Sequence, residues 1–358
     1  MEQCCIKFER FDKKIKGKLI YMFKKFFNQT ERIDTALLRR AFSTPPHFVL
    51  TPLNFLGLQI FRCLFELVID GYRNSRWLVK KNKKWSNSIE RKGYFLQSNF
   101  FEEKDFGEIK ALAGSIISQP AKELAAQKIL VANTDVAKRV LFKAENYDNY
   151  SKAGKRLMDL FFEKKEINDI ATFIIRSEFY RRFDIEIERI NTFSHPDEYD
   201  HNSHWHADRI SRCAKAFFYL NDHNEGSGSY QYVAGSNKLN TRRVFYEFKR
   251  SIWLGFLWIR YLGKQRALNV ASEHEEISTA EFQSMFEKKH LVECMAPENT
   301  ILFSDNRGFH RRGVLDNGVE RFQINLTFYS DRISFFWHPI WKMHRMLFGR
   351  HLSSQKKL

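Results

Sequence analysis

The stretch His204-Trp205-His206-Ala207-Asp208 carries two potential metal ligands, His206 and Asp208, two positions apart. In a β-strand, side chains at positions i and i+2 point to the same face. An imidazole nitrogen and a carboxylate oxygen can then approach one point, as binding of a metal ion requires. The spacing therefore predicts part of a metal site on a strand.

A third ligand is expected about a hundred residues further on, where His310 ends the segment Ser304-Asp305-Asn306-Arg307-Gly308-Phe309-His310. Two histidines and one carboxylate on one side of an iron ion leave three positions open, as in non-haem Fe(II) oxygenases. We therefore predict His206, Asp208 and His310 as metal ligands and catalytic residues. An alternative zinc site, His201-x-x-His204-x-His206, lacks a matching Cys or His cluster to complete it.

Four features in the same order resemble one known family, the phytanoyl-CoA dioxygenase-like Fe(II)/2-oxoglutarate oxygenases. They are the His206-x-Asp208 pair, the distal His310, Arg321 eleven residues later, and a Gly-rich turn and strand ending in Gly235-Ser236. Ala234 and Asn237 depart from the "PGSH" ending of that family. The resemblance covers roughly residues 90–332, including Gly93-Tyr94-Phe95-Leu96, which is similar to the family's opening strand.

The resemblance implies Fe(II) held by the three predicted ligands, with 2-oxoglutarate as cosubstrate and O2 as oxidant. It assigns the distal carboxylate of 2-oxoglutarate to Arg321, because a guanidinium fork matches a carboxylate. A structural salt bridge is the alternative role for this residue. Asn191 and Phe218, on strands expected to line the pocket, are further candidates for holding the cosubstrate. The implied reaction hydroxylates a substrate and releases succinate and CO2.

The pattern of short strands predicts the fold class. Phe322, Ile324, Leu326 and Phe328 alternate with polar residues, and further short strands with glycine turns follow an initial helical region. This combination favours a mainly β protein with flanking helices, an α+β arrangement around a double-stranded β-helix (a cupin-like jelly roll). We expect a basic, partly helical extension over residues 1–90, the oxygenase domain over 91–332, and a basic aromatic tail over 333–358.

Composition limits the surroundings in which the chain works. The 358 residues carry a net charge of +17, which favours anionic partners such as nucleic acid or an acidic membrane surface over a neutral one. Five cysteines without CxxC spacing indicate reduced thiols, and the charges that follow Met1 argue against a signal peptide. The run from 48 to 69 is interrupted by polar and charged residues, so it does not predict a transmembrane helix. The expected location is cytoplasmic.

The substrate is the least determined feature of the sequence. We expect a small or lipid-linked metabolite, and tryptophans among basic residues, such as Trp337 and Trp341, favour peripheral contact with an anionic membrane. Packing against the barrel or a second subunit is the alternative, and the oligomeric state is left open. Nucleic-acid demethylation is a rival reading, but those enzymes carry a second arginine where Thr327 stands. A non-catalytic jelly-roll binding protein is the third reading.

Overall fold

A computed structural model describes residues 84–133, 137–176, 183–190, 204–208, 210, 212–261, 282, 285–286, 290–316 and 318–328, together with scattered positions between 55 and 70. The side chains of residues 133, 254, 255 and 257–261 are not included in this description. Most of the predicted basic extension over residues 1–90, the tail over 333–358, and the individual residues Asn191 and His201 lie outside the described residues.

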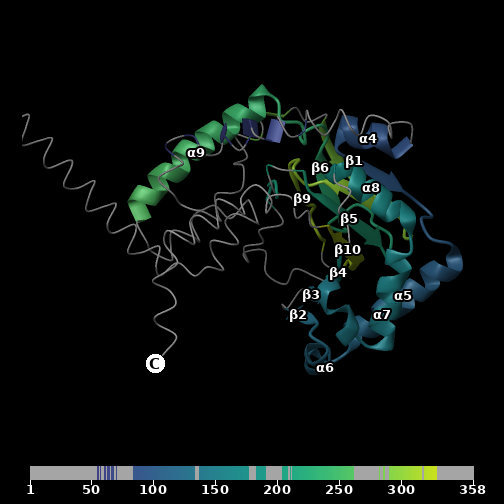
Figure 1. Cartoon of the computed structure of the whole chain (residues 1–358). Helices are drawn as coiled ribbons and strands as arrows, with labels where there is room; N and C mark the ends of the chain where they lie inside the picture. Colours follow the sequence, from purple (N-terminus) through teal and green to yellow (C-terminus); the bar gives the residue numbers. More distant parts are fainter. Residues whose placement is uncertain are drawn as a thin grey trace, which may run out of the picture.

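The core consists of two antiparallel sheets, and the chain passes from one sheet to the other several times (Figure 1). The larger sheet has seven strands in the spatial order β1 (Tyr94–Gln97), β8 (Ile301–Asp305), β5 (Ala214–Tyr219), β10 (Arg321–Thr327), β4 (Asp184–Ile190), β3 (Ala137–Phe142) and β2 (Leu130–Asn133). The smaller sheet has the order β7 (Leu291–Glu293), β6 (Tyr230–Val233) and β9 (His310–Arg312).

Strands that are neighbours in the sheets are mostly distant in the sequence. From β5 onwards the chain passes repeatedly between the two sheets: β5, β8 and β10 belong to the larger sheet, and β6, β7 and β9 belong to the smaller one. This winding is that of a double-stranded β-helix, and it confirms the predicted fold class. An isolated antiparallel bridge between His206 and His310 extends the smaller sheet by one position.

The two faces of the larger sheet have different chemistry because side chains alternate along each strand. On β10, Phe322, Ile324 and Leu326 belong to the main hydrophobic core, as the sequence predicted. The other face of β10 carries Arg321 and Gln323, which are buried but polar. The apolar face is covered by helices, and the polar face lines the interior that contains the candidate site.

Five helices accompany the larger sheet (Figure 1). They are α4 (Lys84–Lys92), α5 (Glu103–Ser118), α6 (Ala121–Ala126), α7 (Lys152–Phe162) and α8 (Lys165–Ile175), with a 3-10 turn, η3 (Ala144–Asn149), before α7. The many basic residues between 73 and 92 favour a linker into the main domain, but the last part of this stretch forms α4. Trp85 and Ile89 of α4 are buried in the main core, so α4 is a packed amphipathic helix.

A long insertion separates β6 from β7. Its main element is α9 (Thr241–Tyr261), which extends away from the sheets (Figure 1). Arg243 forms a buried ion pair of 2.9 Å with Glu247 within α9, and its Nη1 donates to the carbonyl of Arg307 at 3.2 Å, which ties the start of α9 to the core. Within the described part of the chain, no helix combines the length and the apolar character needed to cross a bilayer.

A buried carboxylate, that of Asp70, helps to tie the described positions between 55 and 70 to the rest of the fold. Asp70 pairs with Arg307 at 2.7 Å and with Arg212 at 3.0 Å. Arg212 lies four residues after Asp208, and Arg307 follows Asn306 in the turn that leads to His310. This segment therefore supports the two loops that carry the candidate site.

Candidate metal centre

His206 and His310 are fixed against each other by their backbones. The amide of His206 donates to the carbonyl of His310 at 3.0 Å, and the amide of His310 donates to the carbonyl of His206 at 2.9 Å. Both residues are buried, with exposed fractions of 7% and 3%. The pairing brings two side chains that are distant in sequence to one position at the edge of the smaller sheet.

Hydrogen bonds to the backbone orient both imidazole rings. Nδ1 of His206 lies 2.7 Å from the carbonyl oxygen of His204, and Nδ1 of His310 lies 2.9 Å from that of Gly308. A carbonyl only accepts, so each Nδ1 must carry the proton, and a neutral ring then presents a lone pair on Nε2. Metal-ligating histidines are commonly held by such a second hydrogen bond.

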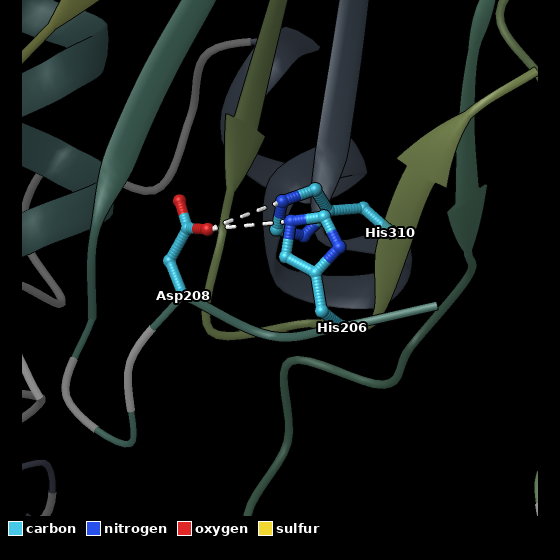
Figure 2. A group of neighbouring side chains, drawn as sticks. All are labelled: His206, Asp208 and His310. Atoms are coloured by element: carbon cyan, nitrogen blue, oxygen red, sulfur yellow. Dashed lines mark ion pairs between the residues drawn. The ribbon is translucent and has the colours of Figure 1, made fainter. Parts of the chain in front are cut away.

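The third group of the site is the carboxylate of Asp208. Its Oδ1 lies 3.7 Å from Nε2 of His206 and 3.4 Å from Nε2 of His310, as the dashed lines in Figure 2 show. A ligand atom from each of the three residues lies within 4.8 Å of the others. Two imidazole nitrogens and one carboxylate oxygen converging from one side form the donor set that suits Fe(II). These residues therefore fit a metal ion.

The other oxygen of Asp208 has partners of its own. Nζ of Lys215 lies 2.7 Å from Oδ2, and Nδ2 of Asn306 donates to the same oxygen at 3.0 Å. Burial would raise the pKa of Asp208, but the charge of Lys215 opposes this effect and holds the pKa of Asp208 well below its usual range. Asp208 is thus ionised, as a metal ligand must be.

The side chain of Asn306 is oriented by a buried network. Its Oδ1 accepts from Oγ of Ser304 at 2.5 Å and from the hydroxyl of Tyr230 at 3.2 Å. Its Nδ2 therefore faces Asp208 and also lies 3.1 Å from Nε2 of His310. The ring of Tyr230 stacks on that of His310 with centroids 5.4 Å apart. One amide group thus links both ligands.

Arg321 lies in a second polar cluster of the interior. Its Nη1 donates to the carbonyl of Gly228 at 2.6 Å, and its Nη2 donates to Oε2 of Glu188 at 2.8 Å. Gln323 donates to the same Glu188 oxygen at 2.9 Å. The structural salt bridge left open by the sequence is therefore present. Nε of Arg321 is nevertheless buried without a hydrogen-bond partner in the described structure.

Positive charge exceeds negative charge around Glu188. Burial would raise the pKa of Glu188, but Arg321, Arg139 and then Arg312 lower it to about 2, so it is ionised. Burial and the charge of Arg321 lower the pKa of Arg312 to about 9. Burial, followed by the charge of Glu188, raises the pKa of Glu186. Three guanidinium groups around one carboxylate leave the cluster suited to a further anion.

The structure corrects one predicted site residue. Phe218 lies on the helix-facing side of β5, where its ring packs against Phe101 at 5.2 Å and Phe161 at 5.6 Å between centroids. The prediction that it lines the cosubstrate pocket is wrong, because the alternation of β5 is shifted by one residue from the expected one. Phe217, opposite Asn325, faces the interior instead, with its ring 4.7 Å from that of Tyr230.

Lys215 and Asn306 were not predicted as site residues. A signal for Lys215 is present, since it is the single charged residue in an otherwise apolar and aromatic strand. Asn306 has no comparable local signal, because its partners come from distant parts of the chain. Among the described residues, the triad is the one cluster able to hold a metal, and His204 contributes a carbonyl to it rather than its ring.

Comparisons with known proteins give only distant likenesses. No family profile matches the sequence, and no curated protein is detectably similar to it. Among solved structures, AviO1 from Streptomyces viridochromogenes is 14% identical with a TM-score of 0.42, covering 68% of this chain and 92% of that one. SnoK, a non-haem α-ketoglutarate-dependent carbocyclase from nogalamycin biosynthesis, has the same identity and TM-score over 70% and 84%. HygX from Streptomyces hygroscopicus, with nickel and 2-oxoglutarate bound, is 15% identical with a TM-score of 0.38 over 69% and 87%.

Proposed function

We propose that this protein is an Fe(II)- and 2-oxoglutarate-dependent oxygenase of the phytanoyl-CoA dioxygenase-like type. The observation that carries the proposal is the convergence of Nε2 of His206, Nε2 of His310 and Oδ1 of Asp208 inside a double-stranded β-helix. A carboxylate with two histidines on one side favours iron with open positions over a closed, four-ligand structural zinc site.

The charge of the interior supports 2-oxoglutarate as the cosubstrate. Arg321 has a buried Nε–H without a partner, and Arg312 is held near it in a cluster that is rich in positive charge. A carboxylate that accepts from Arg321 would satisfy this donor, because guanidinium and carboxylate groups form strong charge-assisted hydrogen bonds. Glu188 then holds the guanidinium in place and does not replace the cosubstrate.

The residues of the chain position and enclose the reacting groups. His206 and His310 present lone pairs from rings fixed by backbone carbonyls, and Asp208 supplies the negative charge. The rings of Tyr230 and Phe217 form an aromatic wall beside His310 and limit the access of water. When bound, iron with 2-oxoglutarate and O2 would supply the oxidising chemistry, with release of succinate and CO2.

We propose hydroxylation of a small or lipid-linked metabolite as the reaction. Peripheral contact with an anionic membrane would suit such a substrate, and α9 offers a surface for it. Phe245 and Phe256 are 57% and 61% exposed on this helix, and Nζ of Lys249 lies 4.9 Å from the Phe245 ring centroid. Exposed aromatic residues beside cations are typical of segments that lie at a membrane interface.

The proposed activity is tested by oxygen uptake and succinate formation. Purified protein with Fe(II) and 2-oxoglutarate should form succinate, and Asp208→Ala should abolish this by removing the charged ligand. Asp148→Ala, which removes an exposed carboxylate on η3, is the matched control and should retain the activity. Succinate formation that is equal in all three proteins, or absent from all three under every metal tested, would overturn the proposal.

The substrate is sought by comparing extracts of cells that contain the wild-type protein or Asp208→Ala. Lipid and polar fractions are analysed separately by mass spectrometry for a product that is one oxygen atom heavier than its precursor. Such a product in the lipid fraction supports a lipid-linked substrate. If it occurs only in the polar fraction, the substrate is a soluble metabolite and the lipid part of the proposal is wrong.

A further inference from the structure

The two oxygens of the Asp208 carboxylate face different surroundings. Oδ1 is directed toward the ring nitrogens of His206 and His310, as Figure 2 shows. Oδ2 is instead held by Lys215 and Asn306. A carboxylate can bind a metal through one oxygen or through both. The partners of Oδ2 decide between these two modes.

Lys215 lies on β5, and Asn306 directly follows β8, the strand next to β5 in the larger sheet. Lys215 on β5 is paired in register with Ser304 on β8, so their side chains share a face. Ser304 in turn orients the amide of Asn306, and the amide nitrogen of Asp208 donates to the carbonyl of Asn306 at 3.0 Å. The carboxylate is thus fixed through both its side chain and its backbone.

We propose that Lys215 and Asn306 are positioning residues that restrict Asp208 to one-oxygen coordination of the metal. This inference rests on the proposed function, because it concerns the metal of that site. Rotation of Oδ2 toward the metal would break a contact of 2.7 Å with an ammonium group and one of 3.0 Å with an amide. Hydrogen bonds of this kind to a charged group are stronger than those between neutral groups.

The restriction has a consequence for the open positions of the metal. With one oxygen from Asp208 and one nitrogen from each histidine, an octahedral ion keeps three positions open. A chelating cosubstrate takes two of these, which leaves one for O2. If Asp208 bound through both oxygens, the same cosubstrate would fill the last two positions. Lys215 and Asn306 would thereby keep the position that O2 requires.

The inner-sphere water of bound Mn(II) measures this directly, without any turnover. Mn(II) is added to the wild-type protein and to Lys215→Met/Asn306→Ala, and the relaxation of water protons is recorded before and after addition of 2-oxoglutarate. In the wild type, three bound waters should fall to one. In the double variant, the relaxation per bound Mn(II) should begin lower by about one third and fall to the outer-sphere value.

Three further variants separate positioning from general damage to the fold. Lys215→Arg, made in the wild-type protein, keeps a charged donor to Oδ2 and should show the same water relaxation as the wild type. Lys215→Met alone leaves the Asn306 network intact and should lie between the two. Lys110→Met removes a surface pair with Glu298 and should match the wild type. If the double variant fails to fold, as judged by circular dichroism, the single variant gives the decisive comparison.

The outcomes distinguish this inference from the proposed function. If the wild type binds Mn(II) and loses two waters to 2-oxoglutarate, the metal site stands. An identical water count in the folded Lys215 variants would then overturn the positioning role alone. If the wild type binds no Mn(II), or if 2-oxoglutarate displaces no water from it, the proposed metal centre is wrong and this inference falls with it.

Discussion

Arg321 combines a structural and a proposed cosubstrate role in one guanidinium group. Two of its nitrogens are already bonded to Gly228 and Glu188, so a substitution must separate the two roles. Arg321→Lys keeps a charge near Glu188 but lacks the planar fork. We expect it to fold and to weaken 2-oxoglutarate binding by about 2–5 kcal/mol, roughly 30-fold to several thousand-fold, in anaerobic titration of the Fe(II) protein.

The matched comparison for this titration is Arg312→Lys, since Arg312 belongs to the same positive cluster. We expect Arg321→Lys to lose more affinity for 2-oxoglutarate than Arg312→Lys. Wild-type affinity in Arg321→Lys together with a large loss in Arg312→Lys would transfer the proposed role to Arg312.

His223 gives a residue-level prediction for the dependence of stability on pH. It is 1% exposed, its ring stacks on that of Tyr219 with centroids 3.6 Å apart, and both ring nitrogens are without hydrogen-bond partners in the described structure. Burial, and then the charge of Arg321, lower the pKa of His223 from 6.5 to about 3. The folded state therefore keeps this ring neutral at pH values where the unfolded chain binds a proton.

A lowered pKa in the folded state contributes stability that is present above the unfolded value and is lost as pH falls toward the folded value. For His223 this interval runs from 6.5 down to about 3. Well below 6.5, the contribution to the unfolding free energy decreases by about 1.4 kcal/mol per pH unit. His223→Phe preserves an aromatic ring against Tyr219 and should flatten the stability curve by that slope in denaturant titrations. Parallel curves for the two proteins would contradict this assignment.

The triad could be predicted from sequence because its chemistry fixes residue types and spacing. Phe217 and Phe218 show the limit of such reasoning, since either aromatic residue could face the interior of β5. Lys215 lies two residues before Phe217, so the two side chains share the face of β5 that points to the interior. The pairing of Lys215 with Asp208 therefore indicates which of the two aromatic residues faces inward. The contacts of Asn306 could not be predicted, because they depend on how distant strands come together.

At the level of elements, Asp70 connects the N-terminal segment to the loops around the metal centre. Its carboxylate pairs with Arg307 and Arg212, whose side chains are 2% and 11% exposed. Asp70→Ala leaves both guanidinium groups buried beside Asp305, whose contacts with them are longer, at 3.3 and 4.0 Å. Breaking a buried pair in this way costs about 3–5 kcal/mol of unfolding free energy.

Denaturant unfolding of Asp70→Ala, with Asp148→Ala as control, measures this contribution. We also expect weaker metal binding in the variant, because Arg307 follows Asn306 directly in the chain. A loss of stability no larger than that of the exposed control would mean that the segment is only loosely attached to the core.

Elements with strong periodicity could be predicted, and short or mixed ones could not. β10 was expected with its two faces correctly assigned, because apolar and polar residues alternate over its full length. β2 and β3 were not predicted individually, since residues 130–142 fall in a stretch expected to contain helical or mixed structure. β3 pairs with β4 and β2 pairs with β3, so β3 takes its strand conformation from a non-local interaction and in turn provides the edge for β2.

At the level of the whole molecule, the net charge of +17 and the exposed side of α9 lead to a test of membrane contact. The protein should sediment with anionic liposomes and be released by salt, since each Lys or Arg near such a surface contributes about 1 kcal/mol. Phe245→Ser/Phe248→Ser should weaken sedimentation by removing exposed apolar area. Val314→Ser, at a position 71% exposed outside α9, is the control. Equal sedimentation of the α9 variant and the wild type would exclude this face.

The central claim is that His206, Asp208 and His310 hold Fe(II) in a site that also binds 2-oxoglutarate. Anaerobic addition of Fe(II) and 2-oxoglutarate to the metal-free protein should produce a visible charge-transfer band from their direct coordination. His206→Ala, Asp208→Ala and His310→Ala should each abolish the band, whereas His290→Ala, outside the triad, should retain it. A band of full intensity in all three triad variants, or no band in the wild-type protein, would contradict the proposed metal centre.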